Sequence, residues 1–365
     1  MNKDEFWLAF ASIEQIGSMF VKRLYEHFGC IKSAWCAGAD DLYKIEPLTK
    51  KQIDYFLQER KKTNPQECLD SVNEKGISYI TFDSPNYPSL LKEISNPPMT
   101  LFYKGDLQRC NFNRTLAIVG SRKASENSKV TLGKIISEFR GTDICIVSGL
   151  AAGIDTAAHK NAIKNNLSTI GVIASGFDYV YPKNNKELYR TIEEQSGVIF
   201  SEYWHSFEPL PWRFPHRNRI VSGLSYGTLV AEAAIKSGAI ITANLCLEQN
   251  RELMCMPGMV SNPNTEGVYK LLKNGAAIVT SARDILETLN WTIKIDKKEN
   301  SIERLNLSEQ EIAILQMIAK DDCNADNISS SLNIPISDLM VKLTMLELGG
   351  YIKQSSGDSY TSLIK

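Results

Sequence analysis

Short apolar runs alternate with longer polar stretches between residues 115 and 289. Two of these runs, Leu116–Val119 and Ile144–Val147, are rich in Ile and Val and show no polar alternation. Runs of this kind are typical of strands that are buried on both faces of a parallel sheet. Further strands are predicted in the same way at Thr169–Ala174, Val198–Phe200, Thr228–Ala231, Leu253–Met256 and Ala277–Val279.

The polar stretches between these strands predict helices, and segment 213–222 is compatible with either a short helix or a loop. Asp155 and either Asn184 or Asn185 suit the N-cap positions of two of them. The regular β-α alternation predicts an α/β fold with an extended Rossmann-like, doubly wound and mainly parallel sheet over residues 73–289. The predicted helices lie at about 126–140, 155–166, 184–195, 238–249, 266–273 and 282–289.

Residues 1–72 are predicted to form an all-helical domain, similar to SAM-like or helix-hairpin-helix modules, with Thr49 as one N-cap. Such modules bind DNA or other proteins, and a protein-interaction role is favoured because the hairpin signal is weak. Strands at 77–82 and 100–105 follow. The prolines between these two strands prevent a regular helix from extending across that stretch.

Residues 290–304 are mostly polar and charged and predict a linker. Residues 305–365 follow the plan of three helices and a hairpin, which is that of a winged-helix domain. Ser308 and Glu311 form a capping-box pattern at the first of these helices. Residues 303–365 carry five Lys or Arg and nine Asp or Glu, a net charge of −4. Because acidic character repels phosphate, this domain is expected to contact protein and not DNA.

The formal net charge of the whole chain is −1, so nucleic-acid binding requires a local basic patch. The eight cysteines are scattered without a C-x-x-C pair, which favours reduced thiols over a metal site or a disulfide framework. The N-terminal residues do not resemble a signal peptide, and no apolar run approaches ~18 residues. A cytoplasmic protein without a membrane span, a metal or a cofactor is therefore expected.

Small and polar residues follow the first two core strands, at the sheet edge where ligands bind in open α/β folds. Gly120, Ser121 and Arg122 offer backbone N–H groups, a hydroxyl and a guanidinium, all of which suit phosphate. Ser148 and Gly149 end the second strand ahead of a helix N-terminus, which attracts anions. Alternatively, the glycines only permit tight turns, but this would not account for Arg122.

Segment 212–219 interleaves arginines with aromatic rings. Basic groups can follow the phosphates of a single-stranded nucleic acid while rings stack on its bases. In a structural alternative these arginines pair with carboxylates such as Glu202 or Glu232, and for Arg219 the two interpretations are evenly balanced. The candidate contacts in this segment are Arg213, Phe214, Arg217, Asn218 and Arg219.

Catalytic interpretations have less support. Neither a P-loop nor the dinucleotide-binding glycine fingerprint occurs. Asp155 and His159 lie one helical turn apart, but a structural pair on one helix face is favoured over a catalytic pair. Residues 223–233 faintly resemble the glycine-rich element of phosphoribohydrolases, although Glu232 lies one residue too far along. A Rossmann-like nucleotide-processing enzyme is therefore the alternative function.

Several motifs, in the same order, resemble those of the DprA/Smf family of DNA-processing proteins. They include GSRKAS, SGLAAGIDTAAH and FPHRNRIVSGLS, and the resemblance covers nearly the whole chain. It implies a single-stranded DNA-binding protein, not an enzyme, that protects incoming strands in natural transformation, helps to load the RecA recombinase and forms homodimers. By resemblance, the phosphate pocket falls on Ser121, Arg122, Ser148 and Gly149, and the DNA groove on Arg217, Asn218 and Arg219.

Some positions depart from the pattern of the family. Ala152 replaces a common arginine and removes one positive charge near the pocket, whereas Lys236 keeps a charge in KSGAIITA. Tyr269 stands where the family has an asparagine. These departures affect the finer contacts of the pocket and not the assignment to the family.

Overall fold

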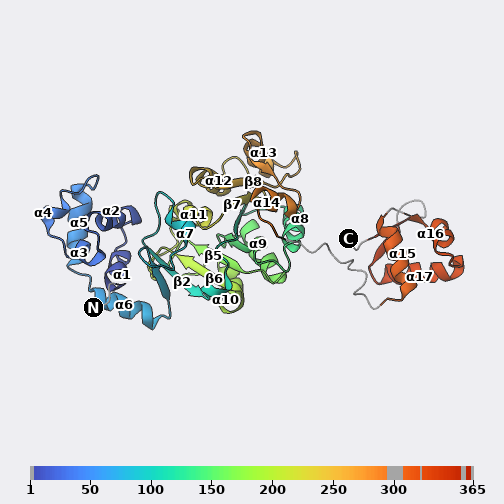
Figure 1. Ribbon diagram of the computed structural model, residues 1–365, viewed down its shortest axis with the longest axis horizontal. Coiled ribbons are helices and arrows are strands. Elements are labelled where there is room, and N and C mark those ends of the chain that lie inside the picture. The colour runs from blue at the N-terminus through green and yellow to red at the C-terminus, as the bar shows by residue number, and fades with distance from the viewer. Residues whose placement is uncertain (1–3, 294–306, 321–322, 355–358, 363–365) are drawn as a thin grey trace. The chain divides into compact units, whose positions relative to one another are not determined.

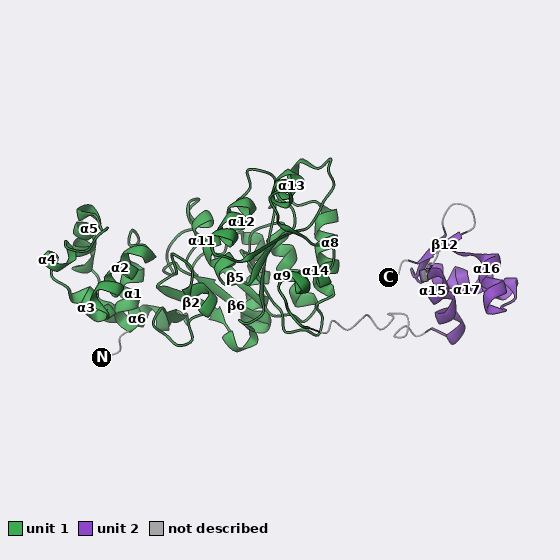
Figure 2. Ribbon diagram, turned by 45° about the horizontal axis from the view of Figure 1, so that its top comes forward, with its two compact units in different colours: residues 1–295 green, residues 296–365 purple. Residues whose placement is uncertain are grey.

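The computed structural model describes residues 4–293, 307–320, 323–354 and 359–362 (Figure 1). The chain divides into two compact units, residues 1–295 and residues 296–365 (Figure 2). The predicted linker at 290–304 lies outside the described residues from position 294 onward. Its first residues belong to the first unit, where the rings of Trp291 and Tyr226 lie 5.9 Å apart.

A nine-stranded sheet forms the centre of the first unit, in the order β1-β2-β6-β5-β4-β3-β7-β8-β9. From β6 through β5, β4, β3, β7 and β8 to β9, neighbouring strands are parallel, whereas β2 pairs antiparallel with both β1 and β6. The prediction of a doubly wound, mainly parallel sheet is therefore confirmed. The strands are β1 (Ser78–Thr81), β2 (Thr100–Gly105), β3 (Thr115–Val119), β4 (Cys145–Ser148), β5 (Thr169–Ile173), β6 (Gly197–Ser201), β7 (Gly227–Val230), β8 (Glu252–Cys255) and β9 (Ala277–Ile278).

Helices cover both faces of this sheet (Figure 1). Apolar side chains of α7, α11, α12 and α13 pack on one face, and those of α8, α9, α10 and α14 pack on the other. The fully apolar strands predicted from the sequence are therefore buried from both sides. The helices are α7 (Ser89–Lys92), α8 (Glu126–Ser137), α9 (Ile154–Lys164), α10 (Lys186–Thr191), α11 (Arg213–Gly223), α12 (Gly238–Glu248), α13 (Glu266–Lys273) and α14 (Ala282–Thr288).

Two local predictions are resolved by the structure. The segment at 213–222 is helix α11, and Pro215 is tolerated because it lies in the first turn, where backbone N–H groups have no intrahelical partner. The N-cap prediction for Asp155 is wrong, because Gly153 occupies that position. Asp155 lies in the first turn of α9, and its carboxylate accepts the N–H of Ala151 at 3.3 Å.

The N-terminal part of the first unit is helical, as predicted. Thr49 caps its helix through a reciprocal capping box with Gln52, which confirms that N-cap. The rings of Phe10 and Phe56 stack 5.1 Å apart in a core that also includes Trp204 of the sheet domain. The helices are α1 (Asp4–Ser12), α2 (Ser18–Phe28), α3 (Ile31–Cys36), α4 (Ala39–Leu42), α5 (Lys50–Arg60) and α6 (Pro65–Glu74).

The second unit has the predicted winged-helix elements. Helix α15 (Glu309–Lys320) begins with the expected capping box, in which the Glu311 carboxylate accepts the backbone N–H of Ser308 at 2.8 Å. Buried apolar side chains from all three helices form its core. The remaining elements are α16 (Ala325–Leu332), α17 (Ile336–Leu348), and a small sheet of β10 (Cys323–Asn324), β12 (Ser359–Ser362) and β11 (Ile352–Gln354).

The turn that leads into α9 should depend strongly on Gly153. Gly153 and Gly141 share a φ of +81°, but a Cβ at Gly153 would lie 2.1 Å from the carbonyl oxygen of Ser121, whereas nothing lies within 4 Å at Gly141. Gly141→Ala should therefore cost only the strain of a positive φ, ~1–2 kcal/mol. Gly153→Ala should cost ~1–3 kcal/mol more, because the backbone must move. Urea unfolding of both variants measures the difference, and equal losses would contradict the predicted clash.

Candidate nucleic-acid interface

The strand order reverses between β3 and β7. Ligands of open α/β sheets bind at such a switch point, in the crevice outside the carboxyl ends of the two strands. The Gly120–Arg122 turn leaves β3 at this place. The backbone N–H of Ser121 donates to the carbonyl of Glu232 after β7 at 2.6 Å. A Cβ on Gly120 would lie 2.5 Å from Ile154, so only glycine lets the turn approach helix α9 this closely.

Arg122 is the exposed cation of this crevice. Its guanidinium lies 5.2 Å from the ring centroid of Phe214, which is the range of a cation–π contact. Among the described residues no carboxylate pairs with Arg122. The ring of Phe214 in turn lies 5.2 Å from that of Tyr181, which is 44% exposed. A cation with free donors therefore stands beside two accessible aromatic rings.

Tyr181 was not selected from the sequence. The signal that identifies it is the same interleaving of rings and cations that singled out 212–219, because Lys183 follows it closely in YPKNN. The sequence could not show that the segment before α10 reaches Phe214 of α11, since the two lie more than thirty positions apart and meet only in the folded sheet.

Arg217 is buried and holds two strand ends together. Its Nη1 donates to the carbonyl oxygens of Gly149, at 2.7 Å, and of Val172. Burial lowers the pKa of Arg217, and the nearby Asp155 carboxylate opposes this shift. The hydroxyl of Ser148, also buried, donates to the carbonyl of Ile118 at 2.6 Å. These hydrogen bonds of Ser148 and Arg217 thus hold the ends of the strands that border the crevice.

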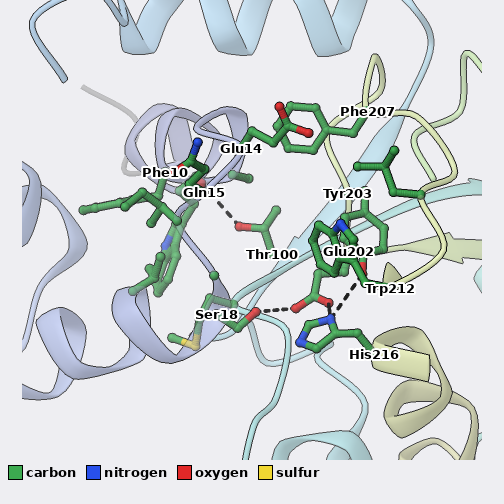
Figure 3. Close-up of a pocket in the computed structure, with 17 residues that line it drawn as sticks. Phe10, Glu14, Gln15, Ser18, Thr100, Glu202, Tyr203, Phe207, Trp212 and His216 are labelled. Atoms are coloured by element: carbon green, nitrogen blue, oxygen red, sulfur yellow. Dashed lines mark hydrogen bonds and ion pairs between the residues drawn. The ribbon is translucent and has the colours of Figure 1, made fainter. Parts of the chain in front are cut away.

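Arg219 lies on the opposite side of α11, where its guanidinium binds both oxygens of Glu202, whose side chain is 9% exposed. The structure thus contains the carboxylate pairing that the sequence left open for this arginine. Burial alone would raise the pKa of Glu202, but Arg219 and His216 hold it well below its usual range. Ser18 of α2 also donates to Glu202, which joins the helical part to the sheet domain (Figure 3).

Arg213 is fully buried and also has a carboxylate partner, Glu14, at 2.6 Å. Asn218 is half-buried and donates to the carbonyl of Gly238 at 3.3 Å, which connects α11 with the start of α12. The exposed Lys236 precedes that start and has no ion pair among the described residues. The predicted site residues therefore divide into exposed groups around Arg122 and buried arginines that position α11.

Glu232 has a structural role at the start of α8. It is fully buried and accepts hydrogen bonds from the hydroxyls of Ser125 and Ser128, both at 2.6 Å, and from the N–H of Ser125. No arginine of segment 212–219 pairs with it among the described residues. A carboxylate satisfied in this way, at a helix N-terminus, fixes the loop that presents Arg122.

Asp155 and His159 are both buried and do not share a hydrogen bond within the described chain. The hydroxyl of Thr169 donates to Ile146 and so accepts from Nδ1–H of His159 at 2.7 Å, which leaves Nε2 without a partner. Burial lowers the pKa of His159 to about 3 and raises that of Asp155 to about 6. The geometry is that of two core residues, not of a catalytic pair.

Within the described residues no group of three or more His, Cys, Asp or Glu could hold a metal ion. No helix among these residues is long and apolar enough to cross a membrane. None of the eight cysteines, all of which lie within the described residues, is part of a disulfide.

The fold and the crevice define a doubly wound α/β protein with an exposed arginine at the switch point of its sheet, followed along the sequence by a winged-helix unit. The family model of DNA recombination-mediator protein A matches residues 78–290 of the chain, and that of the DprA winged helix domain matches residues 303–358. The chain belongs to this DprA/Smf family of DNA recombination mediators.

The similarity to several known proteins covers most of the chain. Protein Smf of Synechocystis is 30% identical over 98% of both chains, and Protein Smf of Escherichia coli is 35% identical over 85% of this chain and 84% of its own. The structure of DprA from Streptococcus pneumoniae is similar with a TM-score of 0.69 and 31% identity, over 79% of this chain and 97% of that one. DprA from Helicobacter pylori, which binds single-stranded DNA, has a TM-score of 0.52 and 28% identity, over 59% and 95% respectively.

Asp155 and His159 should change stability with pH in opposite senses. The folded pKa of His159, about 3, lies below its ordinary 6.5, so its stabilisation is lost as the pH falls through this range. The folded pKa of Asp155, about 6, lies above its ordinary 3.8, so its stabilisation is lost as the pH rises toward 6.

Between about pH 4 and 6 the free energy of unfolding should therefore rise with falling pH in His159→Asn and fall in Asp155→Asn, relative to the unmodified protein. Each change should approach ~1.4 kcal/mol per pH unit. Urea titrations at several pH values measure it. Parallel pH profiles of the three proteins would refute the assigned pKa shifts.

Proposed function

We propose that the crevice at the β3–β7 switch point binds single-stranded DNA, with one phosphate at Arg122 and one base on Phe214. The observation that carries this proposal is the exposed Arg122 guanidinium, which lies 5.2 Å from the Phe214 ring and pairs with no carboxylate in the described part of the chain. A guanidinium can make bidentate bonds to phosphate, and a neighbouring ring can stack a base of any identity. The Helicobacter pylori relative, which binds single-stranded DNA, supports the same class of ligand.

The other predicted site residues have supporting roles in this proposal. Lys236 adds an exposed positive charge, and the turn of Gly120 and Ser121 presents Arg122. Arg217 fixes the strand ends beneath, together with Ser148 and Gly149, and Asn218 aligns α11 with α12. Arg213 and Arg219 hold α11 in place through their carboxylate partners, the exposed Glu14 and the largely buried Glu202. Little sequence preference follows, because phosphate and stacking contacts carry almost no base code.

Membership of a recombination-mediator family extends the proposal to a cellular role. The chain would protect incoming single strands and help to load the RecA recombinase during transformation, which places its action in the cytoplasm. Homodimers would present two such crevices, and linked sites raise the affinity for one strand through effective concentration. Comigration of the chain with RecA on single-stranded DNA tests the interaction with RecA. The mass of the chain in solution tests whether it forms homodimers.

We propose that the chain is not an enzyme. In the alternative, a phosphoribohydrolase-like reaction, Glu232 would act on a nucleotide, but both its oxygens already accept hydrogen bonds in a buried site. Nothing on the described surface of the crevice provides a paired general acid. Release of ribose phosphate from nucleoside monophosphates would instead favour the enzyme.

Arg122→Ala should weaken binding to oligo-dT by ~1.5–3 kcal/mol, because a charged hydrogen-bonding group is lost. The slope of log K against log salt should become less steep by about 0.7, the contribution of one phosphate on a single strand. Fluorescence anisotropy at several salt concentrations measures both quantities. Arg283→Ala is the matched control, because Arg283 is exposed on α14, on the other face of the sheet. Unchanged binding by folded Arg122→Ala protein would rule out the phosphate site.

The winged-helix unit is proposed to contact protein. Its helix α17, which would read a DNA groove, carries large apolar side chains on its exposed side and few charges. These exposed residues are Ile336, Met340, Val341, Met345 and Leu348.

A chain ending at Ile295 should therefore bind oligo-dT with the affinity of the full chain, within about twofold. The truncation retains Trp291 and Ile293, which pack on the sheet domain. Anisotropy titrations of both proteins make the comparison. A large loss of affinity for many sequences would assign the winged helix to DNA.

A further inference from the structure

A cavity of about 530 Å³ opens where the helical part meets the sheet domain (Figure 3). Its walls come from α1, the turn before α2, the segment after β6 and the first turns of α11. This volume lies within the range of small-molecule sites, which are ~300–1,000 Å³. None of the contacts proposed above for Arg122 uses it.

Aromatic side chains lie both at the Arg122 site and at this cavity. Tyr181 and Phe214 lie on one side of α11. Trp212, which is 56% exposed, lies at the N-terminal end of this helix and belongs to the lining of the cavity. The ring of Trp212 is 6.5 Å from that of Tyr203 and 6.4 Å from that of His216, two further residues of the lining. The aromatic series therefore continues around the helix end.

The two sides are close together in space. Residues two apart on an α-helix point about 200° from each other, so Phe214 faces Arg122 while His216 faces the cavity. A helix with its side chains is only ~10–12 Å across. A strand that is bound at Phe214 can therefore reach Trp212 and the cavity within a few nucleotides.

The charged groups of the cavity are already neutralised. The guanidinium of Arg213 pairs with Glu14 and lies about 5 Å from the ring centroids of Tyr203, Phe207 and Trp212, which fixes the aromatic wall. Arg219 neutralises Glu202. The cavity therefore suits an uncharged planar group better than an anion.

Polar groups at the rim can recognise the edges of such a group. Gln15 is exposed and brings an amide that both donates and accepts, and only one oxygen of Glu14 is bound to Arg213. His216 uses Nδ1 towards Tyr203 and Glu202, which leaves Nε2 for a ligand. Flat stacking surfaces with donors and acceptors at their edge are what recognise an unstacked nucleobase.

We propose that this cavity receives a base of the single strand that is bound at Arg122 and Phe214. The inference rests on the proposed function, because the phosphate contact at Arg122 directs the strand towards Trp212. It adds a second base station, built jointly by the helical part and the sheet domain. Since every base presents a stacking face with donor and acceptor edges, the station accepts all four.

Photo-crosslinking of the full chain with an oligonucleotide of 5-iodouracil, followed by mass spectrometry, tests the proposal. Iodouracil forms bonds with aromatic rings on which it stacks. Crosslinks are expected at Phe214 or Tyr181 and, in addition, at Trp212 and Phe207. Crosslinks confined to Tyr181 and Phe214 would overturn the second station while leaving the proposed function intact. No binding of the strand at all would overturn both.

A larger side chain inside the cavity distinguishes base binding in the cavity from base stacking on Phe214. Ala11 is half-buried in its lining, so Ala11→Trp should remove the Phe207 crosslink, keep that of Phe214 and weaken oligonucleotide binding about tenfold, the loss of one base stack. Ser33→Trp adds the same ring at an exposed position of α3 and should change nothing. Persistence of the Phe207 crosslink in folded Ala11→Trp protein would overturn the proposal.

Trp212 provides a test that does not alter the interior. Trp212→Ala should weaken binding and reduce crosslinking at Phe207, whereas Trp212→Tyr should restore both, because a ring is retained. Equal behaviour of the two variants would contradict the proposed route. Free 5-iododeoxyuridine is expected to leave Phe207 unmodified, because it lacks the Arg122 phosphate contact. Modification by the nucleoside but not by the strand would also overturn the inference.

Discussion

The buried guanidinium of Arg217 is the interaction on which the geometry of the crevice depends. It donates to the carbonyls of Gly149 and Val172, so one side chain of α11 holds the carboxyl ends of β4 and β5. Burying a cation is costly unless its charge and donors are compensated, and the Asp155 carboxylate supplies part of this compensation. The same tie fixes the rotation of α11 about its axis. It therefore fixes where Phe214 lies relative to Arg122, and with it the distance between the proposed phosphate contact and the proposed stacking contact.

This constraint explains why a segment rich in arginine offers so little free positive charge. Arg213, Arg217 and Arg219 are all buried. Arg217 donates to interior carbonyls, Arg219 pairs with Glu202, and Arg213 pairs with the exposed Glu14. Removing Arg217 or Arg219 would leave partners in the interior uncompensated, so variants at these two positions would disturb the fold together with the proposed binding. Arg122 differs because its guanidinium is solvated and unpaired among the described residues. In a chain of net charge −1, attraction for a strand must come from such local groups.

The strands and most helices could be predicted because each carries its own local signal: unalternated apolar runs for β3 to β8, and capping boxes at Thr49 and Ser308. Asp155 was wrongly predicted as an N-cap because Gly153, with its positive φ, occupies the N-cap position two residues earlier. The residue types of the site were also readable, but not which of them are accessible. Whether Arg219 binds a phosphate or Glu202 depends on how the residue that follows β6 lies relative to α11 in the folded protein. The local sequence around Arg219 does not carry this information.

The helical part takes part in the geometry of the site through the other side of α11. Glu14 and Ser18 bind Arg213 and Glu202, so the helical part is anchored to the first turns of the helix that carries Phe214. A displacement of α1 and α2 would leave Arg213 and Glu202 without these partners in a buried setting, which is energetically unfavourable. The orientation of the aromatic residues around the N-terminus of α11 is thus coupled to the docking of the helical part. A protein that bound and shifted these helices would act on the proposed DNA-binding surface without touching Arg122.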